Sequence, residues 1–370
     1  MGYANQITLL ASSGYAGRGI GLPVLIGSNR TLDLQISALD ALAVSATTVI
    51  VETSAYAVRD ENERYSITWR QLGSTVELIG PGSASLSLTG ADAFVRVRYA
   101  INAEPSALWV HFSVSGQARC VLVAAAARSG AGVSATVDIE QYHGGRFAAN
   151  VTSAPGSGQT LTLTIERSED GQSGWTTAAT FASIAAVGEY AVESADLDRF
   201  VRVRWTPSGG GSWTFGVQGR TSLIFARPRD RALTGIRRAA IPDISPAQYL
   251  PFLETATATM IGSYKVFVHP LRAWDEDTRQ CCIILADWLA LNSRSKDPVR
   301  PEDGGSAYLA EAERMNVWLA QVGGYERGNR GSGIRPANVI DSSPPTRDGM
   351  RSVYAFQSDT PRQTGRRLVW

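Results

Sequence analysis

The sequence has few of the residues on which disulfide, metal and thiol chemistry depend. Among 370 residues there are three cysteines and three histidines. Cys120, Cys281 and Cys282 show no C-x-x-C spacing, and their odd number argues against a disulfide framework or a structural zinc site. Adjacent cysteines such as Cys281 and Cys282 rarely pair with each other. We therefore expect free thiols in a reducing compartment, with core packing as the favoured role of the adjacent pair.

No catalytic motif accompanies the histidines. His111 falls in an expected strand, His143 in a glycine-rich turn and His269 before a proline, and none has a nucleophile and an acid at recognisable spacing. Residues 17–21, Gly-Arg-Gly-Ile-Gly, are superficially similar to a phosphate loop. They lack the preceding buried strand, the following helix and the terminal lysine of such a loop. We expect no enzymatic activity, cofactor or metal.

The chain also lacks a strong charge of either sign and a long apolar run. Its formal net charge is +1, so no overall field directs it to nucleic acid or to a membrane. No run of about 18 apolar residues could cross a bilayer, and no signal peptide is visible. We expect a protein made in the cytoplasm, or carried in a particle that is assembled there.

What the sequence does contain is one phrase used twice. Phe94–Tyr99 reads Phe-Val-Arg-Val-Arg-Tyr, and Phe200–Trp205 reads Phe-Val-Arg-Val-Arg-Trp, an offset of 200 − 94 = 106. Trp69 and Trp175 are separated by the same 175 − 69 = 106. A shared offset at two landmarks indicates a duplicated module. Alternating apolar and polar residues, as in Leu32–Ile36, predict that each module consists of half-buried strands.

The pattern predicts a multidomain β + α fold. Two duplicated antiparallel β-sandwich modules precede a small all-helical domain and an extended C-terminal arm. The predicted parts are an N-terminal extended arm at 1–27, β modules at 28–126 and 127–226, the helical domain at 227–324, and the C-terminal arm at 325–370.

The repeated phrase has two interpretations. With Phe and Val facing the core, its arginines share the outer face, either as a basic ligand surface or as a solvated face paired with cross-strand acids. We favour the second, because charged outer faces are common on such strands. Tryptophans 69, 109, 175 and 213 are either a stacking platform for sugars or core anchors, and we favour core anchors.

Beyond the arginine-rich linker the period changes from two to 3.6. Ser245 to Gln248 forms a capping-box pattern with a proline at the first helical position. Pro251 is expected to interrupt this segment, so that the longer helix covers Phe252–Tyr264. A second helix is predicted from near Asp275 and a third from near Ser306, ending at a Gly-Gly pair.

The last segment, residues 325–370, shows no periodicity. It carries eight arginines against four acidic residues, a local charge of 8 − 4 = +4. It also contains Tyr354, Phe356 and Trp370, which a purely solvating tail would not need. We interpret it as an arm that becomes ordered on a partner.

A set of short motifs occurs along the helical segment: Ala256-Thr257-Ala258, Ile261, Tyr264, Pro270-Leu271, Cys282-Ile283-Ile284-Leu285-Ala286, Trp288-Leu289, Tyr308-Leu309, Trp318-Leu319 and Gly323-Gly324. Through these residues the segment resembles the small head–tail adaptor (connector) proteins of tailed phages, most closely the Mu-type adaptor family. A long loop, Asn292 to Gly304, departs from the pattern. The β modules are similar to sandwich modules of phage structural proteins through the Ser-x-Asp-Gly turn before Trp175 and the Phe-Val-Arg-Val-Arg strand.

The resemblance implies a structural virion protein in the neck of the particle, assembled in the host cytoplasm. Such proteins form a ring, usually twelvefold, and the implied partners are the portal protein, neighbouring subunits and a downstream tail or neck protein. DNA would pass through without specific binding, and no membrane is involved. Candidate portal or neighbour contacts in the arm are Arg335, Tyr354, Phe356, Arg366, Arg367 and Trp370. Asp275, Glu276 and Asp277 either line the lumen or serve the positive end of a helix dipole.

An alternative function stays open. The two β modules could form a carbohydrate-binding or capsid-decoration protein at the particle surface, acting through the outward arginines and any exposed tryptophan.

Overall fold

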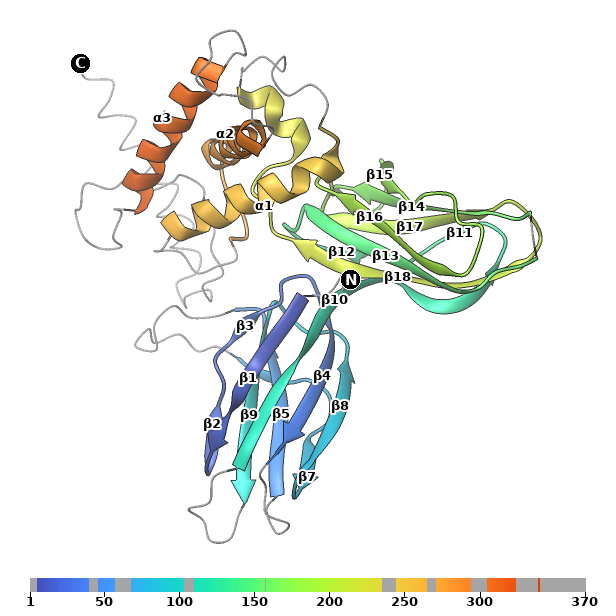
Figure 1. Ribbon diagram of the computed structural model, residues 1–370, viewed down its shortest axis with the longest axis vertical. Helices are drawn as coiled ribbons and strands as arrows, with labels where there is room; N and C mark the ends of the chain where they lie inside the picture. The colour runs from blue at the N-terminus through green and yellow to red at the C-terminus, as the bar shows by residue number, and fades with distance from the viewer. Residues whose placement is uncertain are drawn as a thin grey trace. The chain divides into compact units, whose positions relative to one another are not determined.

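A computed structural model describes residues 5–39, 46–56, 68–102, 110–156, 158–234, 244–264, 271–293, 305–323 and 339. These residues divide into two compact units. The β unit contains the described residues up to 55 and from 68 to 224, and the helical unit contains Tyr56 and the described residues from 225 onward. Figure 1 shows strands in the first and helices in the second.

The first β module is built from two antiparallel sheets. In one sheet β8–β4–β10–β1 are neighbours, and in the other β2 and β3 pair with β9, β9 with β5, and β5 with β6 and β7. The strands are β1 (Asn5–Tyr15), β2 (Arg18–Ile20), β3 (Val24–Leu25), β4 (Thr31–Ala38), β5 (Ala46–Ser54), β6 (Arg70–Gln71), β7 (Val76–Ile79), β8 (Gly82–Leu88), β9 (Phe94–Asn102) and the first half of β10 (Val110–Ser129). Leucines and isoleucine of β4 and valines of β5 and β9 share one buried core.

The second β module has a corresponding strand order. The second half of β10 neighbours β18, which pairs with β13 and then β16, while β11 and β12 pair with β17, β17 with β14, and β14 with β15. The strands are β11 (Gly132–Val133), β12 (Val137–Asp138), β13 (Gly144–Ser153), β14 (Leu161–Ser168), β15 (Thr176–Thr180), β16 (Gly188–Ser194), β17 (Phe200–Pro207) and β18 (Ser212–Ser222). A separate core, including the buried Trp213, fills this module.

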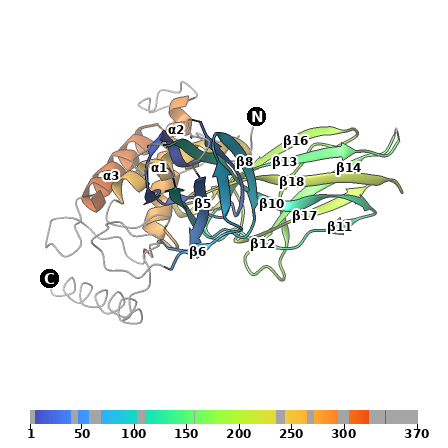
Figure 2. The same ribbon diagram turned by 90° about the horizontal axis from the view of Figure 1, so that it is seen from below.

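The two modules share β10. Its first half pairs with β4, from Phe112 opposite Ala38, and its second half pairs with β18, from Cys120 opposite Gly219. Figures 1 and 2 show β10 continuing beside β18. We expected separate strands here and a boundary between residues 126 and 127. That boundary instead falls inside one strand, which continues past Gly116 and Gln117 as far as Ser129.

The N-terminal segment is part of the first module. We expected residues 1–27 to be an extended arm, but β1 pairs with β10 and β2 with β9. Ile7, Leu9 and Leu10 of β1 are buried. Burial of these apolar side chains therefore holds the N-terminal segment against the first module, although its glycines suggested an irregular backbone.

The repeated phrase places its phenylalanines differently from our expectation. Val95 and Val97 are fully buried on the core face of β9. Phe94 lies two residues before Arg96, and therefore on the same face of the strand as that arginine. Only the valines of the phrase face the core. In the second module, Phe200 lies over the backbone of Gly171, whose φ of 72° allows the turn after β14.

Among its described residues, the helical unit has one short and three long helices. They are η1 (Pro228–Thr234), α1 (Pro246–Ser263), α2 (Glu276–Ser293) and α3 (Gly305–Gly323). The predicted capping box is present: Ser245 Oγ accepts from Gln248 N at 3.3 Å, and Gln248 Oε1 accepts from Ser245 N at 3.1 Å. Pro251 does not interrupt α1, which continues through it, since Leu250 and Leu253 are buried on either side.

A buried polar cluster ties η1, α1 and α2 together. Asp287 Oδ1 accepts from Tyr249 OH and from Arg231 NH2, each at 2.6 Å, and the Arg231 guanidinium lies 4.0 Å from the centre of the Tyr249 ring. Burial raises the pKa of Asp287, although the attraction of Arg231 opposes that shift. Next to this cluster, Cys282–Ala286 of α2 are all apolar and buried.

The prediction of antiparallel β structure followed by a small group of helices is confirmed. That the two β modules are copies of one sandwich, and that the helices form an adaptor domain, stay proposals. None of the helices among the described residues is long and apolar enough to span a membrane.

Candidate functional sites

Each copy of the repeated phrase builds an ion-pair cluster on the outer face of its sheet. In the first module Glu52 of β5 pairs with Arg96 and Arg98 of β9, at 2.8 and 3.1 Å. In the second module Glu166 of β14 pairs with Arg202 and Arg204 of β17, at 2.7 and 2.5 Å. Cross-strand pairing places each glutamate directly opposite the first arginine. The interpretation in which the arginines pair with cross-strand acids is confirmed.

The arginines also fix the position of both matched tryptophans. The guanidinium of Arg96 lies 4.1 Å from the centre of the Trp69 ring, and that of Arg202 lies 4.0 Å from that of Trp175. Both tryptophans are only partly buried. Our interpretation of them as core anchors was wrong, although Trp213 is one; Trp109 lies outside the described residues. An arginine over one face of each ring also reduces the area on which a sugar could stack.

The second cluster holds its carboxylate in the ionised form. Burial alone would raise the pKa of Glu166, but hydrogen bonds from Arg204 and Arg202, with their positive charge, leave the pKa below its ordinary value. The nearby turn is held by Asp170, whose carboxylate accepts from Gln172 N and Ser173 N, each at 2.9 Å. A hydrogen bond from Ser173 Oγ at 2.6 Å, together with these two backbone hydrogen bonds, lowers the pKa of Asp170. Both groups are engaged in structural contacts.

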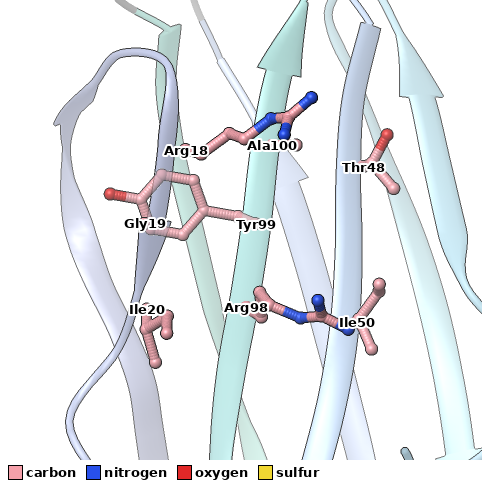
Figure 3. Close-up of a pocket in the computed structure, with 8 residues that line it drawn as sticks. All are labelled: Arg18, Gly19, Ile20, Thr48, Ile50, Arg98, Tyr99 and Ala100. Atoms are coloured by element: carbon pink, nitrogen blue, oxygen red, sulfur yellow. The ribbon is translucent and has the colours of Figure 1, made fainter.

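A shallow groove of about 420 Å³ lies over β2, β9 and β5 of the first module (Figure 3). Strand pairing places Arg18, Ala100 and Thr48 in one row, and Ile20, Arg98 and Ile50 in the next. Figure 3 shows the Tyr99 ring reaching toward Gly19, and Arg98 reaching toward Ile50. A side chain at Gly19 would collide with the Tyr99 ring, so this glycine permits the close approach.

Part of the glycine-rich segment 17–21, which is superficially similar to a phosphate loop, lines this groove through Arg18, Gly19 and Ile20. Arg18–Ile20 forms strand β2, and no helix follows it; β3 does. Sequence reasoning did not identify the groove. A comparison of the two repeats could have pointed to it, because the 106-residue offset aligns the small Ala100 with the larger Thr206.

The acidic residues before and in the first turn of α2 have different roles. Asp275 caps the helix, accepting from Thr278 N at 2.9 Å and from Thr278 Oγ1 at 2.6 Å. Burial raises the pKa of Asp275, and the hydrogen bonds from Thr278 oppose that shift. Glu276 and Asp277 are exposed in the first turn. The helix-end interpretation accounts for Asp275, so only Glu276 and Asp277 are left as candidate lumen residues.

The cysteines and histidines form no reactive cluster within the part of the chain that the structure describes. All three cysteines are free and buried, and burial raises the pKa of Cys120 and Cys282 to about 12. His143 Nδ1 lies 3.1 Å from the carbonyl oxygen of Leu197, and His269 is outside the described residues. No group of three or more potential metal ligands occurs among the described side chains.

The candidate contacts of the C-terminal arm lie outside the described residues: Arg335, Tyr354, Phe356, Arg366, Arg367 and Trp370. Within that segment only Val339 is described, and its side chain is buried. The partner contacts predicted for the arm stay predictions.

Comparison with known proteins gives no family. No protein-family model matches the chain, and no curated protein matches it. Solved structures that resemble it include the PBSX exported protein XepA, with 12% identity and a TM-score of 0.22 over 59% of this chain and 86% of that one. A putative secreted protein from Parabacteroides distasonis has 10% identity and a TM-score of 0.20, over 59% and 88% of the two chains.

A further resemblance is to infectious bursal disease virus, strain Gx, with 12% identity and a TM-score of 0.19 over 60% of this chain and 72% of that one. Likenesses at these TM-scores say nothing about what the chain binds or assembles with.

Proposed function

We propose that this chain is a structural protein of a virus particle, and in particular a head–tail adaptor that joins the portal of a tailed phage to the next tail component. The proposal rests on one observation, which is the positions, within the helical unit, of the residues that resemble the adaptor family. Cys282–Ala286 are all buried in α2. Of the other resembling residues that the structure describes, Trp288 and Leu289 also lie on α2, and Leu271 lies between α1 and α2. The rest lie on α1, at its C-terminal end or on α3. The proposal assigns no catalysis and no cofactor to the chain.

The ring arrangement follows from the resemblance. The expected assembly is a homo-oligomer, a dodecamer, in the neck of the virion, whose arms contact the portal and neighbouring subunits. A ring repeats each weak arm contact many times, which offsets the entropy lost when an arm becomes ordered. The β modules would be accessory domains of this ring.

A portal-binding experiment tests the proposal. The full-length chain is mixed with the portal protein of the same phage and imaged in negative stain, and we expect rings attached to the portal. Replacing Tyr354, Phe356 and Trp370 by serine should reduce portal attachment. Val187→Ser, at a position 59% exposed in the β unit, is the matched control. Absence of both rings and portal attachment for the wild-type chain would overturn the proposal.

The lumen assignment needs variants that leave the helix cap intact. Because Asp275 caps α2, we would change only Glu276 and Asp277, to glutamine and asparagine. If these side chains line a DNA passage, removing their repulsion should reduce the amount of DNA packaged per particle. Unchanged packaging, with particles assembled normally, would assign both residues to the helix dipole alone.

We also infer that the two β modules arose by duplication. The spacing between the stacked tryptophan and its arginine is 96 − 69 = 27 in the first module and 202 − 175 = 27 in the second. The glutamates are separated by 166 − 52 = 114, so the segment between glutamate and tryptophan has changed length.

The alternative, a carbohydrate-binding or decoration protein, would require the tryptophans to accept a sugar ring. Arg202 lies over one face of Trp175, which makes this the weaker proposal. Glycan-array binding that is lost in Trp175→Ala, with an unchanged unfolding temperature, would favour it over the adaptor.

A further inference from the structure

The groove over Ala100 is lined in part by residues that the second module replaces with others. The 106-residue offset aligns Ala100 with Thr206, and Arg98 with Arg204. Gly19 and Gly132 correspond as well, because each pairs with the aromatic residue of its phrase. Ala131 therefore takes the place of Arg18. The residues that build the ion-pair cluster are the same in both modules, whereas Arg18 and Ala100 of the groove are replaced by Ala131 and Thr206.

The groove exists because its central side chain is small. Ala100 lies between Arg18 and Thr48 in the same cross-strand row, and a methyl group cannot fill the space between them. The second module has a β-branched threonine at this point, opposite Thr162. A convex group from a ligand can therefore enter at Ala100, with Ile20 and Ile50 as apolar walls.

The charge at one end of the groove is positive. Arg18 is exposed and has no ion pair among the described residues. Arg98 has a side chain that is 50% exposed, and it binds Glu52 through Nε at 3.1 Å. The opposite end carries Glu77, which pairs with Thr48 across β5 and β7. A carboxylate on a ligand would therefore bind at the β2 and β9 side.

The apolar surface continues along the edge of the sheet. Ile20, Leu22 and Leu25 are 57%, 78% and 41% exposed, and they lie within six residues of chain. An extended chain of that length covers roughly 20 Å. Clustered exposed aliphatic side chains of this kind mark interaction surfaces. Their linear arrangement matches a chain-like ligand better than a compact one.

We propose that this groove, with the strip Ile20–Leu25, binds an extended acidic segment of a partner protein. An aliphatic side chain of the segment fills the space over Ala100, and a neighbouring carboxylate binds Arg18 and Arg98. Further apolar side chains of the segment pack on Leu22 and Leu25. The partner is thus a peptide in which aspartate or glutamate alternates with aliphatic residues. This binding does not depend on the adaptor function, so a failure of ring formation leaves it unaffected.

Selection from a displayed library of random ten-residue peptides on the full-length chain tests the proposal. We expect enrichment of peptides that carry acidic residues beside aliphatic ones. Affinity is then measured by fluorescence polarisation with a labelled copy of the best peptide. Arg18→Glu should weaken binding by about tenfold or more, the scale of a lost charge-assisted hydrogen bond. Binding should also weaken as salt concentration rises.

The second module supplies matched variants. Ala100→Thr introduces the second module's own residue and should weaken binding by filling the groove, whereas Thr206→Ala should leave binding unchanged. If Ala100→Thr fails to fold, a second pair serves the same purpose. Ile20→Ser should weaken binding, and Val133→Ser should leave it unchanged. Thermal unfolding of each variant confirms that it is folded.

Several results would overturn the proposal. They are the absence of any enriched peptide, enrichment of peptides without acidic residues, and equal affinity of wild-type and groove variants. Binding of free octanoate with no binding of peptides would assign the groove to small carboxylates. Concentration-dependent dimerisation that is abolished by Ala100→Thr would assign it to a second copy of this chain.

Discussion

At the scale of single residues, two glutamates organise the outer faces of the β modules. Glu52 and Glu166 each hold two arginines of the neighbouring strand, and one arginine of each pair lies over a tryptophan. A glutamate, two arginines and a tryptophan thus form one connected cluster in each module. The repeated phrase has the same role in both modules: its arginines contact the glutamate and the tryptophan, and its valines are buried in the core.

Glu166→Gln should destabilise the β unit. The side chain of Glu166 is 10% exposed, and its loss of charge weakens the ion pairs to both Arg202 and Arg204. We expect the free energy of unfolding to fall by about 1.5 to 3 kcal/mol, the range for hydrogen bonds to charged groups. Urea unfolding followed by tryptophan fluorescence measures this change. Glu189→Gln, on an exposed part of β16, is the control, and an equal effect of the two substitutions would contradict the prediction.

The contribution of Glu166 should depend on pH. Its pKa in the folded protein is below the ordinary value, so its stabilisation is complete above that ordinary value of about 4.3. The stabilisation is lost as the pH falls through the ordinary value toward the folded pKa. The difference in unfolding free energy between wild type and Glu166→Gln should therefore be largest at neutral pH and shrink below about pH 4. A difference that grows on acidification would contradict this sign.

Asp287→Ala should destabilise the helical unit more than Tyr249→Phe does. Removing the carboxylate breaks the ion pair between Asp287 and the Arg231 guanidinium, whose side chains are 6% and 13% exposed. Breaking a buried pair in this way costs about 3 to 5 kcal/mol. Tyr249→Phe removes the hydroxyl that donates to Asp287 at 2.6 Å but keeps the ion pair, and it should cost about 1 kcal/mol. Helix unfolding measured by circular dichroism separates these values, and equal losses would show that the cluster is not electrostatically coupled.

At the scale of elements, α1 contains a proline that its packing tolerates. Pro251 is exposed and cannot donate a backbone hydrogen bond to the preceding turn. Pro251→Ala should restore that bond and raise the free energy of unfolding of the helical unit by about 1 to 3 kcal/mol. Ala258→Gly, later in the same helix, should lower it by about 1 kcal/mol. A loss of stability in Pro251→Ala would mean that the proline ring makes a necessary contact.

Helices and strands are predicted correctly from the sequence where the residues that determine them are close neighbours in the chain. The capping box at Ser245 and the starts of α2 and α3 were predictable because caps and helical periodicity depend on neighbouring residues. Pro251 was misjudged because burial of Leu250 and Leu253 outweighs a local preference. The single strand β10 was divided in two because Gly116 and Gln117 weaken the alternation. The Ala100 groove was missed because it depends on three strands that are far apart in the sequence.

At the scale of the whole molecule, the β modules are joined by more than a linker. Asn29 of the first module accepts from Thr221 N of the second at 2.9 Å, through Oδ1, and both residues are buried. Ser28 Oγ lies 2.5 Å from Thr221 Oγ1, and Arg30 forms an ion pair with Glu140. With β10 common to both sheets, these contacts favour cooperative unfolding of the β unit.

Asn29→Ala should therefore weaken both modules. It leaves the buried Thr221 N–H without its acceptor, which costs about 1 to 3 kcal/mol. Hydrogen–deuterium exchange of peptides from β4 and β13 reports on the two cores separately. In the wild-type chain we expect both peptides to exchange through the same global opening, and in Asn29→Ala both should lose the same protection. The control Glu189→Gln should change neither. Loss of protection in β4 alone would show that the modules unfold independently, and that β10 does not transmit stability from one core to the other.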